Sequence, residues 1–171
     1  MIRKFLRKVF SRKAPAAIPV SQSIAKLSII PFKHHGIRRS QISPCALKIT
    51  TSLQQAGFSA YIVGGAARDL LLGLTPKDFD VATNATPEEV HHIFRRSRII
   101  GRRFRLVHVM CGSETVEVST FRGHSPVDEN EDASISLTDQ HGRLLRDNVF
   151  GSQEEDAVRR DFTINALFYD P

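Results

Sequence analysis

The sequence predicts an α/β (α+β) fold in which helices flank a small mixed sheet. Two observations carry this prediction: helical and strand-like patterns alternate along residues 43–171, and no internal repeat divides the chain. With 171 residues, the chain is long enough for one domain that buries a hydrophobic core. We therefore expect a single globular domain that needs neither disulfides nor a structural metal to fold.

Residues 1–42 are predicted to be a basic N-terminal arm and linker preceding a domain over residues 43–171. The arm places Lys and Arg around four apolar residues, and no acidic residue occurs before position 66. A short amphipathic helix, a transit peptide and an RNA-contacting arm all fit this composition. A secretory signal is excluded because no apolar region of 7–15 residues follows, and no run approaches the ~18 residues of a membrane span.

Capping residues and apolar spacing predict the helices. Ser43 is a candidate N-cap with Pro44 at the first helical position, and Thr86 opens a capping box. Glycines at positions 57 and 73 are the expected stops of the first two helices. The predicted helices cover residues 43–57, 66–72, 86–94 and 154–167.

Short apolar or alternating runs predict strands over residues 61–63, 78–83, 106–110 and 116–121. The last two are expected to pair around a turn at Gly112-Ser113. Residues 122–153 are polar and irregular, and a connection of this length predicts a mobile functional loop.

Cys45 and Cys111 form no CxxC pair, so their spacing gives no metal-ligand motif and no disulfide framework. Both are predicted to be buried thiols in a reducing cytoplasm. The formal net charge of +6 favours an encounter with polyanions such as nucleic acid, although a basic surface without a partner remains an alternative.

Asp78 and Asp80 are two positions apart on a predicted strand, so their side chains should share a face, with Cα atoms about 7 Å apart. Two neighbouring carboxylates repel, and Mg²⁺ relieves this repulsion while keeping sites free for water and phosphates. Glu117, on a later strand, is the candidate third carboxylate for a two-metal site. Exposed acidic pairs without metal are the common alternative. His108 is predicted to pack within its strand, with a role as a base left open.

Gly64 and Gly65 separate a predicted strand from a predicted helix. Backbone amides in such a turn can approach phosphate groups at the positive end of the helix. Arg68 could reach a phosphate oxygen, and Asp69 could cap or orient the loop. A tight strand–helix turn without a ligand is the alternative.

These motifs together resemble the tRNA nucleotidyltransferase and poly(A) polymerase family, whose head belongs to the polymerase-β-like nucleotidyltransferases. The resemblance covers residues 43–171, and its motifs are Gly64 to Asp69, Asp78-Phe79-Asp80, the strand around Glu117, and Arg159-Arg160-Asp161 with Asn165. It implies two Mg²⁺ ions on Asp78, Asp80 and Glu117, with ATP as substrate. It also implies nucleotide binding by the Arg159-Arg160-Asp161 motif, where Asp161 and Asn165 would share one face of a helix.

Within the family, the stretch from Ile99 to Val109 and the stretch from Arg146 to Gly151 resemble the bacterial poly(A) polymerases. The resemblance implies addition of AMP from ATP to RNA 3′ ends. Arg102, Arg103 and Arg105 form a cationic strip suited to RNA, or else a solvated face.

The family's base-reading motif and its helical neck and body lie beyond the last motif, and this chain stops at Pro171 before them. Two alternatives stay open: a CCA-adding tRNA nucleotidyltransferase, and a non-catalytic RNA-binding remnant.

Overall fold

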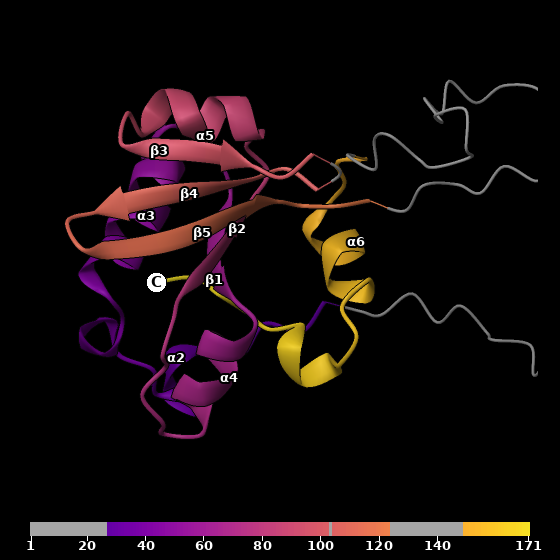
Figure 1. Ribbon diagram of the computed structural model, residues 1–171. Helices are drawn as coiled ribbons and strands as arrows, with labels where there is room; N and C mark the ends of the chain where they lie inside the picture. Colours follow the sequence, from indigo (N-terminus) through magenta and orange to yellow (C-terminus); the bar gives the residue numbers. More distant parts are fainter. Residues whose placement is uncertain (1–26, 103, 124–148) are drawn as a thin grey trace, which may run out of the picture.

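A computed structural model describes residues 27–102, 104–123 and 149–171. Six strands form one mixed sheet in the order β3-β4-β5-β2-β1-β6 (Figure 1). Strands β2 and β5 are parallel, and the other described neighbours are antiparallel. The strands are β1 (Ala60–Val63), β2 (Asp80–Thr83), β3 (Ser97–Ile100), β4 (Leu106–Cys111), β5 (Glu114–Thr120) and β6 (Phe168–Tyr169). The predicted α/β class with a small mixed sheet is confirmed.

The helices begin where the capping signals predict. Ser43 Oγ accepts a hydrogen bond from Ala46 N at 3.0 Å, and Thr86 and Glu89 form the reciprocal capping box. None of the described helices is long and apolar enough to cross a membrane. The helical segments are α2 (Phe32–His35), η1 (Arg39–Gln41), α3 (Pro44–Gln55), α4 (Gly65–Leu71), α5 (Pro87–Ile93), α6 (Gln153–Val158) and η2 (Thr163–Asn165).

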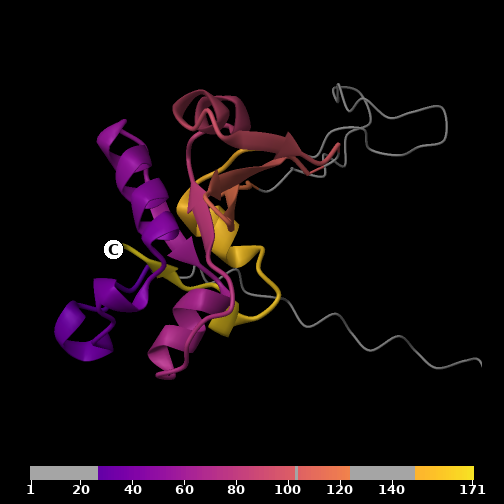
Figure 2. The same cartoon turned by 60° about the vertical axis from the view of Figure 1, so that its left-hand side comes forward.

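The main core lies between one face of the sheet and helices α3 and α5. Ile49 and Leu53 of α3 are fully buried, as are Val116 and Val118 of β5. Residues alternate between the two faces of a strand, so Glu117 projects from the opposite face of β5. In Figure 2 the yellow C-terminal segment runs from α6, near the strands, to the chain end marked C near α3, and the charge of Arg160 in this segment acts on Asp80. The C-terminal segment therefore borders the face that carries Glu117.

A smaller aromatic cluster covers part of this second face. Phe121 stacks on Tyr61 with ring centroids 6.2 Å apart, and Phe168 of β6 meets both rings edge-on. Val63 and Ala82 complete the cluster. It anchors β6 to β1, whose Val63 is the register partner of Asp80.

Part of the segment predicted as linker packs with the domain. Ile37 and Ile42 are buried in the same core cluster as α3. Their burial extends the packed region toward the N-terminus beyond the expected start at residue 43. Residues 1–26, which include the basic arm, lie outside the described residues.

The predicted C-terminal helix over residues 154–167 is wrong. Helix α6 ends at Val158, and the chain continues through η2 into β6, which pairs with β1 through Ile62 and Tyr169. Gly64 N donates to Leu167 O at 3.2 Å, so strand pairing replaces helical bonds at this end. Pairing with β1 joins residues more than a hundred positions apart and gives no local sequence signal.

Two strand predictions also differ from the structure. The strand predicted from residue 78 begins only at Asp80, since its ladder with β1 starts at the Val63–Asp80 pair. Strand β3, which was not predicted, pairs with β4 around a turn at Gly101. Gly101 has φ 87°, and a Cβ there would collide with the carbonyl of Phe104.

The prediction of two separate thiols is wrong, because the structure joins Cys45 and Cys111 in a disulfide with Cα atoms 5.8 Å apart. Cys45 lies in the first turn of α3, and Cys111 is the last residue of β4. They are 66 positions apart in sequence and become neighbours only through helix–sheet packing. Spacing alone could not reveal this.

Only the ends of the predicted loop over residues 122–153 can be placed. Arg122 and Phe150 form an isolated antiparallel bridge, and Gly151 N donates to Phe121 O at 3.1 Å. Residues 124–148 lie outside the described residues, so the predicted mobility of the loop stays a prediction.

Candidate active site

Asp80 and Glu117 lie side by side at the centre of the sheet. They are register partners on the parallel strands β2 and β5, with Asp80 at the first position of β2. On the other side of Glu117, His108 of β4 is its antiparallel partner, and His108 Nε2 lies 3.7 Å from Glu117 Oε2. The second face of the sheet thus presents two carboxylates with an imidazole beside them.

The surroundings of Asp80 raise the pKa of its carboxyl group. Desolvation is the largest cause, followed by the negative charges of Glu117 and Asp78, while the positive charge of Arg160 acts in the opposite direction. The residue as a whole keeps an exposed surface at the strand start, but protein atoms crowd its carboxyl group. The carboxylates therefore repel one another where the sequence predicts a cation.

Asp78 lies in the turn between α4 and β2 rather than on a strand. Strand alternation therefore does not align Asp78 with Asp80. Asp78 nevertheless acts on Asp80 through its charge, so the structure does bring it into the same electrostatic cluster.

Gly64 and Gly65 form the turn between β1 and α4. Gly64 has φ 67° and ψ −130°, a region open in practice only to glycine, and it is the N-cap of α4. Gly65 is the first helical residue. This turn follows Val63, the register partner of Asp80, so it lies beside the carboxylates.

Arg68 links α4 to the C-terminal segment. Its Nε and Nη2 donate to Asp69 Oδ1 at 2.9 and 2.8 Å, and its Nη1 donates to Asn165 Oδ1 at 3.0 Å. Three of the predicted nucleotide-binding residues therefore form one network.

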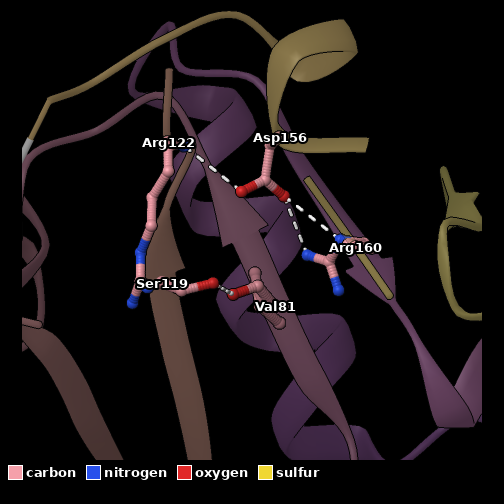
Figure 3. A network of polar contacts seen from close by, with 5 residues as sticks. All are labelled: Val81, Ser119, Arg122, Asp156 and Arg160. Atoms are coloured by element: carbon pink, nitrogen blue, oxygen red, sulfur yellow. Dashed lines mark hydrogen bonds and ion pairs between the residues drawn. The ribbon is translucent and has the colours of Figure 1, made fainter. Parts of the chain in front are cut away.

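A second network surrounds Arg160 (Figure 3). Arg160 donates from Nε and Nη2 to Asp156 Oδ2 at 3.3 and 2.8 Å, and its guanidinium lies 5.2 Å from the centre of the Phe168 ring. A Cβ built on Gly64 would lie 3.7 Å from Arg160 Nη1, which places this cation beside the glycine turn.

The remaining predicted residues are not brought together. Arg159 is the C-cap of α6, and Asp161 is exposed in the turn before η2, so Asp161 and Asn165 share no helix face. In the predicted cationic strip, Arg105 forms an ion pair with Glu88 of α5. Arg102 is exposed, and Arg103 lies outside the described residues.

The donor chemistry of the site suits a hard cation. Among the described residues, no three His, Cys, Asp or Glu side chains are gathered in an arrangement that could hold a metal ion. Asp80 and Glu117 nevertheless place oxygen donors next to each other, and their mutual repulsion is what a divalent cation relieves. Carboxylate oxygens of this kind are ligands that Mg²⁺ prefers.

Sequence reasoning missed Asp156. Its spacing of four residues from Arg160 on a predicted helix was a usable signal, because such pairs face each other. The hydrogen bond from Arg122 N to Asp156 could not be predicted from the sequence, because it depends on how α6 packs on the sheet.

This mixed sheet, with its glycine turn beside neighbouring carboxylates, is the fold of a nucleotidyltransferase head. Residues 60–171 match the poly(A) polymerase head domain, and the chain belongs to that family.

The relatives fall into two groups. Poly(A) polymerase I of Salmonella typhi is 55% identical over 170 residues, which is 98% of this chain and 36% of that protein. A CCA-adding enzyme of Lactobacillus helveticus is 39% identical over 125 residues, 73% of this chain and 29% of that protein. The crystal structure of the Bacillus stearothermophilus CCA-adding enzyme in complex with CTP matches with a TM-score of 0.55 and 39% identity, covering 75% of this chain and 28% of that one. The chain thus spans well under half the length of these relatives.

Proposed function

We propose that this chain is the head of a template-independent nucleotidyltransferase that adds AMP from ATP to RNA 3′ ends. The observation that carries the proposal is the in-register pair Asp80–Glu117 beside the Gly64 turn and Arg160. Neighbouring carboxylates, a glycine turn at a helix start and an oriented guanidinium are groups that phosphoryl transfer uses. The greater identity to a poly(A) polymerase than to a CCA-adding enzyme supports ATP as the nucleotide.

Asp78, Asp80 and Glu117 would hold two Mg²⁺ ions, which would supply charge neutralisation at the triphosphate and make the RNA 3′-hydroxyl a better nucleophile. Arg160 and the amides of Gly64 and Gly65 would face triphosphate oxygens.

The nucleotide's ribose would meet polar groups of the C-terminal segment. Asn165 is already oriented by its hydrogen bond from Arg68, and Asp161 follows α6 with an exposed carboxylate free to accept from a hydroxyl. Arg68 and Asp69 would hold this arrangement, and Arg159 at the end of α6 would add positive charge toward the nucleotide. RNA would lie along Arg102, Arg103 and Arg105, in the cytoplasm where RNA and ATP are both available.

A CCA-adding activity is the second candidate, favoured by the 39% identity to CCA-adding enzymes and by the likeness to one crystallised with CTP. The third is an RNA-binding protein without catalysis. The candidates differ in which nucleotides they consume, so one assay separates them.

The test is extension of a labelled RNA in Mg²⁺ with each of the four nucleoside triphosphates separately and then together. The natural protein, purified from its own cells, is assayed beside the 171-residue chain. Tails made from ATP alone support the proposal, whereas addition of C and A only would support the CCA-adding activity instead.

Asp80→Ala controls for the metal assignment. We expect extension to fall at least about a thousandfold, corresponding to roughly 4 kcal/mol, while RNA binding changes less than about twofold. Extension that survives this change would show that Asp80 is not a metal ligand.

A further inference from the structure

Asp156 sits at the junction between α6 and the sheet. Only 12% of its side chain is exposed, and both carboxylate oxygens are in use. Oδ2 accepts from Nε and Nη2 of Arg160, while Oδ1 accepts from the backbone N–H of Arg122 at 3.2 Å (Figure 3). One carboxylate thus ties the helix, the arginine and the end of β5 together.

The contact with Asp156 does not involve Nη1 of Arg160. Asp156 engages Nε and Nη2, and Figure 3 shows the remaining nitrogen pointing away from Asp156. That nitrogen, Nη1, is the atom nearest to the Cβ position of Gly64. The ring of Phe168 supports the guanidinium at 5.2 Å. Asp156 therefore holds Arg160 through Nε and Nη2, and within the described part of the chain no hydrogen bond engages Nη1, which can donate beside the glycine turn.

The charge of Arg160 reaches the carboxylate cluster as well. It lowers the pKa of Asp80, against the effects of desolvation and of Glu117. Arg160 thus lies beside the glycine turn and near enough to Asp80 to act on its pKa, and a triphosphate would contact the same groups under the proposed function.

An exposed ion pair at this helical spacing contributes little to stability, because water screens both charges and the side chains stay mobile. The Asp156–Arg160 pair differs in three respects: it is mostly buried, it uses two donors of the guanidinium, and Asp156 also accepts from the backbone of Arg122, which follows β5. Such a geometry fixes the orientation of a guanidinium rather than merely adding stability.

We infer that Asp156 is a positioning residue, which holds the guanidinium of Arg160 toward the triphosphate of the incoming nucleotide. The inference rests on the proposed function and adds to it a residue that does not itself touch the substrate. Asp156 acts only through Arg160, so the effects of substitutions at the two positions on ATP affinity should not be additive.

The first test is Asp156→Asn. The amide oxygen still accepts from Arg122 N, but the anionic partner of Arg160 is lost. We expect the KM for ATP to rise about tenfold while kcat changes less than threefold, and Asp156→Glu to recover most of the affinity. Glu154→Gln is the matched control, because it removes an exposed charge from the same helix, and it should alter KM less than twofold.

The second test is a double-mutant cycle of ATP affinity, measured by calorimetry in Ca²⁺, with Asp156→Ala, Arg160→Ala and both together. A positioning role predicts that the double variant binds no more weakly than Arg160→Ala alone. Losses that multiply, in variants whose circular dichroism matches the parent, would overturn the inference.

The two proposals can fail separately. If the natural protein binds ATP but extends no RNA, the proposed function fails, and the cycle still decides the role of Asp156. If it binds no ATP at all, both proposals are overturned.

Discussion

Asp80 and Glu117 are direct neighbours across β2 and β5, the one pair of adjacent strands in the described sheet that run parallel. Neither residue has an Arg or Lys ion-pair partner among the described residues; the contact recorded for Glu117 is His108. Two carboxylates kept at such close range are unfavourable for folding alone, which makes their effect on stability measurable.

Asp80→Asn is expected to stabilise the protein at neutral pH when metal is removed with a chelator. Because the pKa of Asp80 is raised in the folded state, the folded protein retains its proton more strongly than the unfolded chain does. Below pH 3.8, the ordinary pKa of this carboxyl group, Asp80 is mostly protonated in both states and does not lower the free energy of unfolding. As the pH rises through the folded-state pKa, Asp80 becomes charged in the folded protein and lowers the free energy of unfolding.

The expected gain for Asp80→Asn at pH 7 is a few tenths of a kcal/mol and at most about 1 kcal/mol, since solvent screens the group in part. Urea unfolding at pH 7 and at pH 3.5 measures it, and the gain should vanish at the lower pH. Glu114→Gln on β5, the strand of Glu117, is the control and should give a smaller change. An Asn variant less stable than its parent at pH 7 would show that desolvation and repulsion do not dominate at Asp80.

Mg²⁺ is expected to raise the unfolding temperature of the parent protein and not that of Asp80→Asn. A ligand at ten times its Kd stabilises by about 1.4 kcal/mol, which corresponds to roughly 3–6 °C for a domain of this size. Thermal unfolding with Mg²⁺, against KCl of equal ionic strength, measures the shift. Equal shifts in both proteins would place any metal site elsewhere.

Gly64→Ala is expected to lower stability by about 1–3 kcal/mol. Gly64 has φ 67° and ψ −130°, which an alanine adopts only under strain. The new Cβ would meet Arg160 Nη1 at an ordinary 3.7 Å, so backbone strain rather than collision is the cause. Affinity for ATP should fall as well if the turn approaches phosphate.

Gly65→Ala provides the matched control one residue further along. Gly65 is the first residue of α4, its φ is not positive, and its Cβ would lie 3.5 Å from Arg68 Nη2. We expect stability unchanged or raised by up to about 1 kcal/mol. Chemical unfolding of both variants compares them, and equal losses would argue against a special conformation at Gly64.

Local signals were sufficient for much of this fold. The capping residues Ser43 and Thr86 begin helices as predicted, and the pair of strands around Gly112 forms the expected hairpin. Each depends on residues within a few positions of one another, so sequence spacing contains the information.

The C-terminal segment shows where such reasoning fails. Residues 159–167 contain no proline or glycine and resemble the continuation of a helix, yet the chain leaves α6 because Phe168 and Tyr169 pair with β1. Partners far apart in sequence decided this structure. The same holds for Asp156, whose value at the site depends on the docking of α6 against Arg122.

The Cys45–Cys111 disulfide is expected to stabilise the domain by about 2–4 kcal/mol, because it closes a long loop that an unfolded chain would otherwise explore freely. Urea unfolding with and without dithiothreitol measures this difference. The double variant Cys45→Ser/Cys111→Ser is the control, and its unfolding curve should not respond to the reductant. Titration of thiols in urea should find none in the oxidised parent. Since disulfides are rare in cytosolic proteins, alkylation at the moment of cell lysis decides whether the bond exists in the cell. Unfolding curves of the parent that coincide in both conditions would mean that the pairing contributes nothing to stability.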